Sequence, residues 1–238
     1  MDSIKLLIGW DEREAVGSHV FLQSVVENCS LPIDATILTP KLLKSLGVGT
    51  DGTNNFSKAR FLAPWLNRYC GRCIFMDGAD MLVIGDLAEL WGMWDPSCAV
   101  QVVKHDYKPR NKRKYIGTTL EADNECYERK NWSSLILWSC SYAAHRTLTP
   151  QHINETEGPK LHRFGWLPDD RIGELPKEWN VLIDEDNQSK DAKLAHFTNG
   201  LPGFLHYGNA PHSDKWKQSW HAMNIGMQHK VTIGTDGR

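Results

Sequence analysis

The chain has 238 residues, 41% of them hydrophobic, which is enough to bury a substantial core as one compact domain. Its 27 basic residues nearly balance its 29 acidic ones, which leaves no electrostatic basis for wrapping a nucleic-acid backbone. No apolar stretch approaches the roughly 20 residues that span a bilayer, and the start lacks a signal-peptide pattern. We therefore expect a cytoplasmic protein with no nucleic-acid partner and no stable membrane insertion.

Strand-like and helix-like patterns alternate along the first hundred residues. Residues 5–9 form a short apolar run typical of a buried strand, and residues 14–27 carry apolar side chains at helical spacing. Residues 33–38 predict a second strand. Residues 57–69 predict a helix that leads into a third strand ending at Asp77. This order is typical of an α/β fold.

Fewer regular elements are expected further along. Asp86 and Glu89 have the spacing of a capping box, so Asp86 is expected to cap a helix rather than bind a ligand. Residues 99–104 and 133–138 have strand-like composition. The last hundred residues are irregular, with a short final helix over 213–223.

Six cysteines are spread along the chain: Cys29, Cys70, Cys73, Cys98, Cys126 and Cys140. Cys70 and Cys73 have the spacing of half a zinc site, but no second pair completes it. In a chain of this length without a secretion signal, reduced and mostly structural thiols are expected.

The predicted third strand ends in two carboxylates, Asp77 and Asp80, separated by Gly78 and Ala79. Ligands of open α/β sheets gather outside the carboxyl ends of strands, and magnesium or manganese require hard oxygen ligands there. The pattern therefore indicates a site for a metal-bound diphosphate. The alternative is a turn whose aspartates only cap backbone groups.

Ten tryptophans are more than a core of this size usually needs. Aromatic faces pack against the apolar faces of sugars, so Trp10, Trp132, Trp166 or Trp179 can line a saccharide site. The alternative for each of them is ordinary core packing.

Taken in their order along the chain, the motifs resemble those of the GT-A glycosyltransferases, most closely the family 8-like group of nucleotide-sugar enzymes. The matching segments lie between roughly residues 4 and 207: Ile8-Gly9-Trp10-Asp11, Ala59-Arg60-Phe61, residues 75–90, Asn131-Trp132-Ser133-Ser134, Leu167-Pro168-Asp169-Asp170, residues 175–180 and residues 196–200.

The resemblance implies an α/β GT-A (Rossmann-like) fold with a central mixed, mainly parallel sheet flanked by helices. It implies one catalytic domain over residues 1–238, with a nucleotide-binding half at roughly 1–105 and an acceptor and sugar half at 106–238. The implied reaction is metal-dependent transfer of a hexose from a UDP-sugar to a carbohydrate or other hydroxyl acceptor, with retention of anomeric configuration.

The resemblance also implies a set of metal ligands. The family has a DxD motif at this strand end, whereas here one extra residue separates Asp77 from Asp80. Asp80 aligns with the acid that binds metal directly, and Asp77 reaches the same ion or the ribose. His196 opens the segment that completes the family's metal site. An imidazole beside two carboxylates favours manganese, with magnesium as the alternative.

The lysine that follows this histidine in the family is missing from its expected place. The charge that neutralises the diphosphate must then come from elsewhere, and Lys58, Arg60, Lys193 and Lys215 are candidates. Arg60 is favoured because it lies in the matching helix, and its alternative is a surface salt bridge. Together with the metal it would stabilise the leaving group.

The remaining family positions concern the nucleotide and the sugar. Trp10 and Asp11 are expected beside the base and ribose. The other expected nucleotide contacts are Gly9, Lys58, Gly78, Ala79 and Gly200. Asn131, Asp169 and Asp170 are expected beside the donor sugar, where they would hold hydroxyls or steady an oxocarbenium-like centre; the alternative for the two aspartates is a helix cap.

His105 follows another strand and is a candidate for facing the acceptor. Residues 110–114 can form a mobile flap over the donor or a solvated basic loop.

Three other functions are compared with this one. A Rossmann oxidoreductase is disfavoured because no Gly-x-Gly-x-x-Gly follows the first strand. A non-catalytic sugar-binding module would explain the tryptophans and would not need metal-dependent nucleotide binding. A metal-dependent phosphodiesterase or nucleotide-sugar hydrolase would cleave the donor equally well with or without an acceptor.

Overall fold

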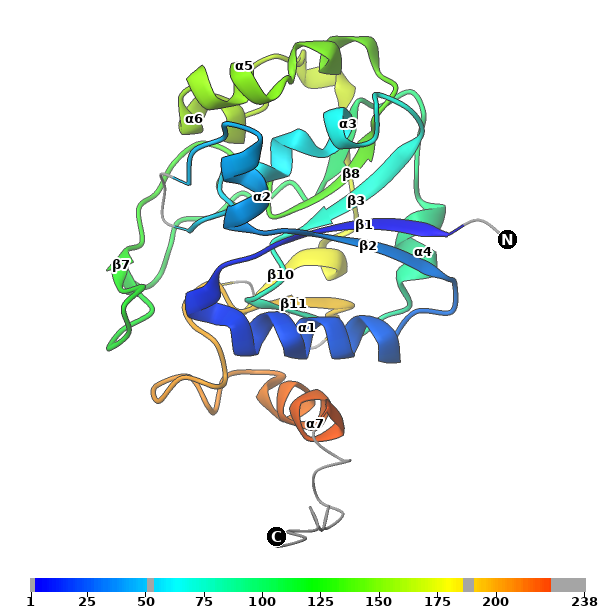
Figure 1. Ribbon diagram of the computed structural model, residues 1–238. Helices are drawn as coiled ribbons and strands as arrows, with labels where there is room; N and C mark the ends of the chain where they lie inside the picture. The colour runs from blue at the N-terminus through cyan, green and yellow to red at the C-terminus, as the bar shows by residue number, and fades with distance from the viewer. Residues whose placement is uncertain (1–2, 51–53, 186–190, 224–238) are drawn as a thin grey trace, which may run out of the picture.

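A computed structural model describes residues 3–50, 54–185 and 191–223 of the chain. Its centre is a six-stranded sheet with the order β2-β1-β3-β8-β5-β9 (Figure 1). The strands are β1 (Ile4–Gly9), β2 (Ile33–Leu38), β3 (Arg72–Met76), β5 (Val100–Val102), β8 (Leu135–Ser139) and β9 (Ile172–Glu174). β1 pairs in parallel with β2 and β3, and β5 with β9, whereas β8 runs antiparallel to β3 and β5. The predicted mixed, mainly parallel sheet is confirmed.

Two smaller sheets accompany the six-stranded sheet. β10 (Val181–Leu182), β11 (Leu194–His196) and β4 (Met81–Val83) form a three-stranded sheet in that order. β6 (Arg113–Lys114) and β7 (Ala122–Asp123) form an antiparallel pair. Because β3 and β4 are separated only by residues 77–80, the acidic turn connects the main sheet to the three-stranded sheet.

Helices cover both faces of the main sheet (Figure 1). α1 (Ala15–Glu27) and α4 (Leu87–Gly92) contribute to the core on one face. The other face is covered by α2 (Pro40–Ser45), α3 (Ala63–Leu66), α5 (Pro150–Glu155) and α6 (Gly158–His162). α7 (Ser213–Met223) packs on α1. The described residues also form five 3-10 helices: η1 (Glu12–Glu14), η2 (Ala59–Leu62), η3 (Ala143–Thr147), η4 (Asp169–Arg171) and η5 (Lys177–Asn180). In the described ranges no helix is both long enough and apolar enough to cross a membrane.

The central strands are buried on both faces, which explains their continuous apolar sequences. On β1, Leu7 belongs to the core cluster on one face, and Leu6 and Ile8 to the cluster on the other. Trp138 and Leu137 divide in the same way on β8. This alternation follows from the two-residue period of a strand.

Most predicted elements are found close to their expected bounds. The strand at 33–38 and the helix at 213–223 match β2 and α7. Asp86 caps α4, as expected, by accepting a hydrogen bond from the Ala88 backbone N–H at 3.0 Å. The single helix predicted over 57–69 is wrong. η2 is followed by α3, which ends at Leu66, and Pro64 lies where the hydrogen-bonding pattern changes.

Candidate active site

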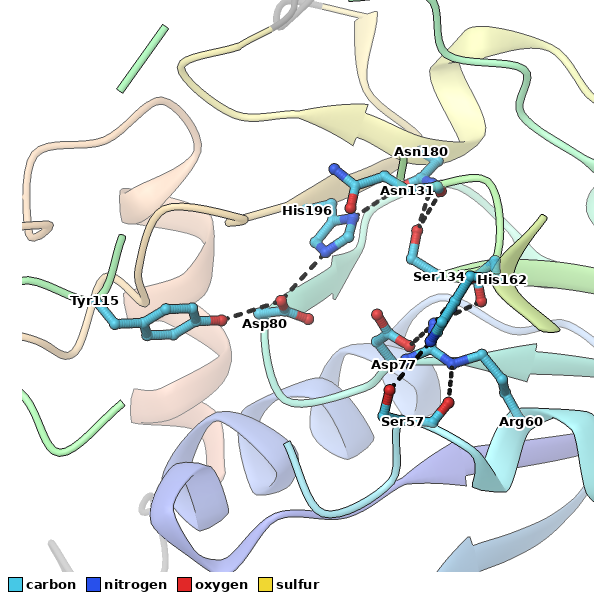
Figure 2. A network of polar contacts seen from close by, with 11 residues as sticks. Ser57, Arg60, Asp77, Asp80, Tyr115, Asn131, Ser134, His162, Asn180 and His196 are labelled. Atoms are coloured by element: carbon cyan, nitrogen blue, oxygen red, sulfur yellow. Dashed lines mark hydrogen bonds and ion pairs between the residues drawn. The ribbon is translucent and has the colours of Figure 1, made fainter. Parts of the chain in front are cut away.

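Asp77, Asp80 and His196 come together at the carboxyl end of β3 (Figure 2). β11 runs antiparallel to β4 with His196 opposite Met81, so the histidine lies beside the acidic turn. One ligand atom from each of the three residues lies within 4.8 Å of the other two. Pairing between strands thus unites groups that are more than a hundred residues apart.

Two glycines hold the acidic turn tightly. Gly78 has φ of +88°, a left-handed conformation in which a side chain is strained, and an added Cβ would lie 2.7 Å from Ile8 Cγ2. Gly17 of α1 faces the turn from the other side, and a Cβ there would lie 2.2 Å from the Ala79 carbonyl oxygen. The extra residue between the two acids is therefore accommodated between β1 and α1.

Asn180 fixes the tautomer of His196. Its Nδ2 donates to Ser134 Oγ at 2.9 Å and to the carbonyl oxygen of Asn131 at 3.4 Å. Because a carbonyl only accepts, the amide oxygen of Asn180 must face His196 Nδ1, 2.9 Å away, and Nδ1 donates to it. In the neutral ring, the lone pair of Nε2 then points toward Asp80, whose Oδ2 lies 3.2 Å away. This is the arrangement of a metal-binding histidine.

Tyr115 secures Asp80 from the opposite side. Its hydroxyl donates to Asp80 Oδ2 at 3.2 Å, and its backbone N–H donates to the Asn199 carbonyl at 2.7 Å. Burial alone would raise the pKa of Asp80, but a His196 ring that carries a proton on Nε2, the charge of Lys114 and the tyrosine hydrogen bond together outweigh it and lower the pKa. Asp80 is therefore held as a carboxylate.

Arg60 approaches the other acid of the turn. Its Nη1 lies 2.9 Å from Asp77 Oδ1 and donates to the Ser133 carbonyl at 2.7 Å, while Nε donates to the Ser57 carbonyl at 3.0 Å. Both ionic side chains are almost completely buried. Burial raises the pKa of Asp77 to about 7, with Arg60 opposing the shift and the charge of Asp80 adding to it.

The donor set fits a divalent cation. Asp77 Oδ1 and Asp80 Oδ1 are buried and accept no hydrogen bond from a described residue. Asp77 Oδ1 has the charge of Arg60 beside it at 2.9 Å, whereas Asp80 Oδ1 has no such ion pair among these residues. Buried carboxylate oxygens without such partners are costly unless a positive charge compensates them. Two carboxylate oxygens and one imidazole nitrogen are ligands that manganese accepts.

Asp77, Asp80 and His196 line one cavity, the active-site cavity, together with other side chains. Glu14 lies at its wall, where burial, followed by the charge of Asp80, raises its pKa to about 8. His162 Nδ1 forms a hydrogen bond with Ser133 Oγ at 2.8 Å. Burial, together with the charge of Arg60, lowers the pKa of His162 to about 3. Lys114 of β6 also lines the cavity. Sequence reasoning did not identify Glu14, Tyr115, His162 or Asn180 as site residues, and it considered Lys114 only as part of a basic flap.

Several expected nucleotide contacts lie outside the set of residues that line this cavity. Asp11 is fully buried and accepts hydrogen bonds from the backbone N–H groups of Arg13 and Asn55, each at 3.0 Å. Trp10 packs its ring edgewise against His19. Lys58 donates to the Asn154 carbonyl at 3.0 Å.

The expected glycine contacts serve close packing. A Cβ on Gly9 would lie 2.3 Å from the Phe56 ring, and one on Gly200 would lie 2.4 Å from the Tyr207 ring. Of the expected backbone contacts, Gly78 and Ala79 lie in the acidic turn itself.

The two predicted sugar-binding aspartates lie on the surface. Asp169 pairs with Arg129 at 2.7 Å and Asp170 with Arg171 at 3.5 Å, and their side chains are 83% and 70% exposed. Neither lines the active-site cavity, whereas Asn131 does. This arrangement does not favour the role expected for the two aspartates.

The other candidate lysines also lie away from the cavity. Lys193 pairs with Glu89, and Lys215 lies on α7.

Comparison with known proteins identifies a relative in plants. No family model matches the chain. Protein CDI of Arabidopsis thaliana is 33% identical over 222 residues, an alignment that covers 89% of this chain and 84% of that protein.

Solved structures of glycosyltransferases share the fold. The bifunctional glycosyltransferase WbbM aligns with a TM-score of 0.65 at 14% identity, over 95% of this chain and 51% of its own. GlyE of Streptococcus pneumoniae aligns with a TM-score of 0.59 at 11% identity, over 100% of this chain and 66% of its own. The chain thus spans about half of WbbM and two thirds of GlyE. The galactosyltransferase LgtC, solved with donor and acceptor sugar analogues, aligns with a TM-score of 0.57 at 12% identity, over 92% of this chain and 96% of its own. The chain therefore has the GT-A glycosyltransferase fold.

Proposed function

The chain belongs to the same family as Protein CDI of Arabidopsis thaliana, and from this premise and its fold we propose that it is a metal-dependent glycosyltransferase. The substrate class is a UDP-hexose, and the acceptor is a carbohydrate or another hydroxyl compound. The observation that carries the proposal is the convergence of Asp77, Asp80 and His196 at the carboxyl end of β3. The resemblance of the motifs to family 8-like enzymes supports transfer with retention.

Asp77, Asp80 and His196 are the residues that would hold the metal, with manganese preferred because one ligand is an imidazole. When bound, a divalent cation supplies positive charge that stabilises the departing diphosphate. Asn180 keeps the unprotonated nitrogen of His196 directed at this site, and Tyr115 holds Asp80 in place. The protein thus prepares the ligands before the ion arrives.

Lys114 is our candidate for the cation that replaces the missing family lysine. Arg60 is already paired with Asp77 and bound to two carbonyl groups, so much of its charge and hydrogen-bonding capacity is used. Lys114 lines the same cavity, and its charge acts on both Asp77 and Asp80. Its neighbour Tyr115 is anchored to the Asn199 carbonyl, which keeps this part of β6 beside the metal ligands.

Asn131 is our candidate for a contact with the donor sugar. Its side chain lies at the edge of the cavity and donates through Nδ2 to the Tyr107 hydroxyl at 2.7 Å, which leaves the amide oxygen to accept from a sugar hydroxyl. Its backbone has φ of +62°, a conformation that asparagine tolerates better than most residues. The division into a nucleotide-binding half and an acceptor half remains part of this proposal.

The test is release of UDP from a panel of UDP-hexoses by the purified protein. We expect release that requires Mn²⁺, is abolished by a chelator and by Asp80→Asn, and rises when a hydroxyl acceptor is added. Product analysis by NMR then gives the anomeric configuration. Equal release with and without every acceptor would instead identify a nucleotide-sugar hydrolase, and saccharide binding without any nucleotide binding would identify a sugar-binding module.

A further inference from the structure

A second cavity of about 280 Å³ lies beside the active site. It opens at the carboxyl end of β5 and is lined by the segment from His105 to Lys108, together with Arg110 and Lys177. A third, more open cavity of about 700 Å³ shares residues 105–108 with it, so the two are continuous. None of the residues assigned above to the metal, the diphosphate or the donor sugar lines either of them.

Three cationic and two acidic side chains of the described residues line the second cavity, although the whole chain carries a net charge of −2. Its cations are Lys108, Arg110 and Lys177, and its acids are Asp106 and Glu185. Glu185 keeps its negative charge, and its two carboxylate oxygens are held in place because they accept from the Arg110 backbone N–H at 2.8 Å and from an asparagine amide at 3.3 Å. Among the described residues, neither Lys108 nor Lys177 forms an ion pair, so these two charges are available to a ligand.

The third cavity extends the same charge pattern. It adds Lys104, Arg129 and Lys130 and one further acid, Glu128, and Arg129 is also paired with Asp169 at 2.7 Å. Lys104 and Arg129 lie over the ring of Trp132, with their charged groups 5.8 and 5.3 Å from its centroid. An apolar ring face surrounded by cations is suited to a sugar or similar compound that carries negative charge.

Two polar groups of the second cavity lack partners within the described part of the protein. His105 Nε2 is buried and makes no hydrogen bond. The Tyr107 hydroxyl oxygen accepts from Asn131, and no acceptor is found for its own proton. Buried polar groups are normally paired, so a water or a ligand entering the cavity is the partner that remains.

The second cavity is also adjacent to the donor. Asn131, which holds the Tyr107 hydroxyl, lines the active-site cavity, and Tyr127 lines both the active-site cavity and the third one. A compound anchored at Lys108 and Lys177 would thus lie next to the proposed position of the donor sugar.

We propose that the second cavity binds an anionic group of the acceptor, a phosphate or a carboxylate, through Lys108, Lys177 and the Tyr107 hydroxyl. The description of this ligand as the acceptor rests on the proposed function, whereas anion binding does not. The enzyme then selects acidic hydroxyl compounds over neutral ones, because a neutral acceptor leaves the cations without a partner.

The test is calorimetric titration, in the presence of chelator, with glucose 6-phosphate, glucuronate and glucose. We expect both anions to bind and neutral glucose to bind at least about tenfold more weakly, in keeping with the strength of charge-assisted hydrogen bonds. The tighter of the two anions indicates whether phosphate or carboxylate is preferred. The double variant Lys108→Ala, Lys177→Ala should lose at least about tenfold in anion affinity.

A matched control removes two equally exposed lysines that line none of these cavities, Lys44 and Lys112, and should bind the anions like the wild type. Equal binding of glucose and the anions, no anion binding, or equal affinities of the two double variants would each overturn the proposal.

UDP binding with Mn²⁺ separates this inference from the proposed function. The Lys108→Ala, Lys177→Ala variant should bind UDP normally, since neither lysine lines the active-site cavity. If the wild type binds anions but not UDP, the transferase proposal fails and the anion site stands. If it binds UDP but not anions, the anion site fails alone.

Discussion

Asn180 determines which nitrogen of His196 faces the two aspartates. Its amide orientation is fixed by a carbonyl and a hydroxyl on the opposite side, so its oxygen can only accept from Nδ1. Partners of this kind set both the tautomer and the ring angle of metal-binding histidines. We therefore expect Asn180 to raise metal affinity without contacting the metal.

The variant Asn180→Ala tests this assignment. We expect Mn²⁺ affinity, measured by electron paramagnetic resonance without nucleotide, to fall by about 10- to 100-fold, the usual effect of losing such a partner. Asn67→Ala removes an amide that bonds only a nearby carbonyl and serves as the control. Unchanged Mn²⁺ affinity in a folded Asn180→Ala protein would show that His196 does not depend on this hydrogen bond.

Lys114 is assigned to the diphosphate, and that assignment has a separate test. Lys114→Ala should weaken binding of UDP by about tenfold or more, because one charge-assisted contact is lost. Uridine carries no phosphate and should bind both proteins equally. Lys112→Ala removes an exposed lysine two positions away and should change neither affinity. A loss of uridine affinity that matches the loss for UDP would instead indicate a damaged site.

The metal ligands could be predicted from sequence, but the residues that position them could not. Asp77 and Asp80 follow an apolar strand, and His196 opens a family motif, so each has a local signal. Tyr115 directly follows the candidate flap 110–114 and Asn180 ends the matching segment 175–180, but neither signal shows that Tyr115 reaches Asp80 across 35 positions or that Asn180 reaches His196 across 16. Such partners are fixed by tertiary packing alone.

At the scale of elements, the acidic turn depends on how closely α1 approaches it. Gly17 lets the helix contact the Ala79 carbonyl, and a Cβ there would overlap this oxygen at 2.2 Å. Backbone is the obstacle, so the clash cannot be relieved by rotating a side chain.

We expect Gly17→Ala to lower the free energy of unfolding by about 1–3 kcal/mol, the usual cost of overpacking, and also to weaken Mn²⁺ binding. Urea unfolding and Mn²⁺ titration measure the two effects. Gly92→Ala is the control, because a Cβ at this α4 position meets nothing within 4 Å. If Gly17→Ala matched Gly92→Ala in both measurements, α1 would not constrain the turn.

The helix predicted over 57–69 shows where periodicity is insufficient. Its apolar residues do face the core, as Phe61 and Leu62 show, so the face was correct although the element was not. Pro64 lacks a backbone N–H, so it cannot continue the hydrogen-bond series of η2, and it lies in the first turn of α3, where that N–H is not needed. Arg68 and Tyr69 then adopt positive φ and end the segment.

For the molecule as a whole, the main sheet could be predicted from sequence better than the irregular C-terminal part. Apolar runs predicted β1, β3, β5 and β8, because buried strands read as continuous hydrophobic sequence, whereas β9 at the edge of the main sheet was not predicted. The bridging role of β4 and β11 was not apparent, since each has only three residues. The active-site cavity depends on both the sheet and this bridge.

Stability of the whole molecule should depend on pH through His145. Its Nε2 lies 3.0 Å from the Ala99 carbonyl, and its Nδ1 accepts from Trp166 Nε1 at 3.2 Å, so the folded protein holds the ring neutral. Burial lowers its pKa from 6.5 to about 4. Between these pH values the unfolded chain binds a proton at His145 that the folded chain does not. The contribution of His145 to the free energy of unfolding is therefore fully present above pH 6.5 and declines as the pH falls toward 4.

At pH 5 this histidine should reduce the free energy of unfolding by roughly 2 kcal/mol relative to pH 7.5. Urea titrations at the two pH values measure the difference. His145→Gln lacks the titrating group, so lowering the pH from 7.5 to 5 should destabilise it by roughly 2 kcal/mol less than the wild type. The other buried groups act equally in both proteins: His105 and His162, whose pKa values burial lowers to about 3, act in the same direction as His145, and Glu14 and Asp77, whose pKa values burial raises to about 8 and about 7, act in the opposite direction. An equal pH difference in wild type and variant would contradict the role given to His145.

The central claim is a metal-dependent nucleotide site made by Asp77, Asp80 and His196. Calorimetric titration of UDP into the protein, with Mn²⁺ and with chelator, tests it most directly when repeated on Asp80→Ala and His196→Ala. We expect UDP binding that depends on Mn²⁺ and on the side chains of Asp80 and His196. UDP binding that persists in chelator or in both variants, or no UDP binding to the wild type, would contradict it.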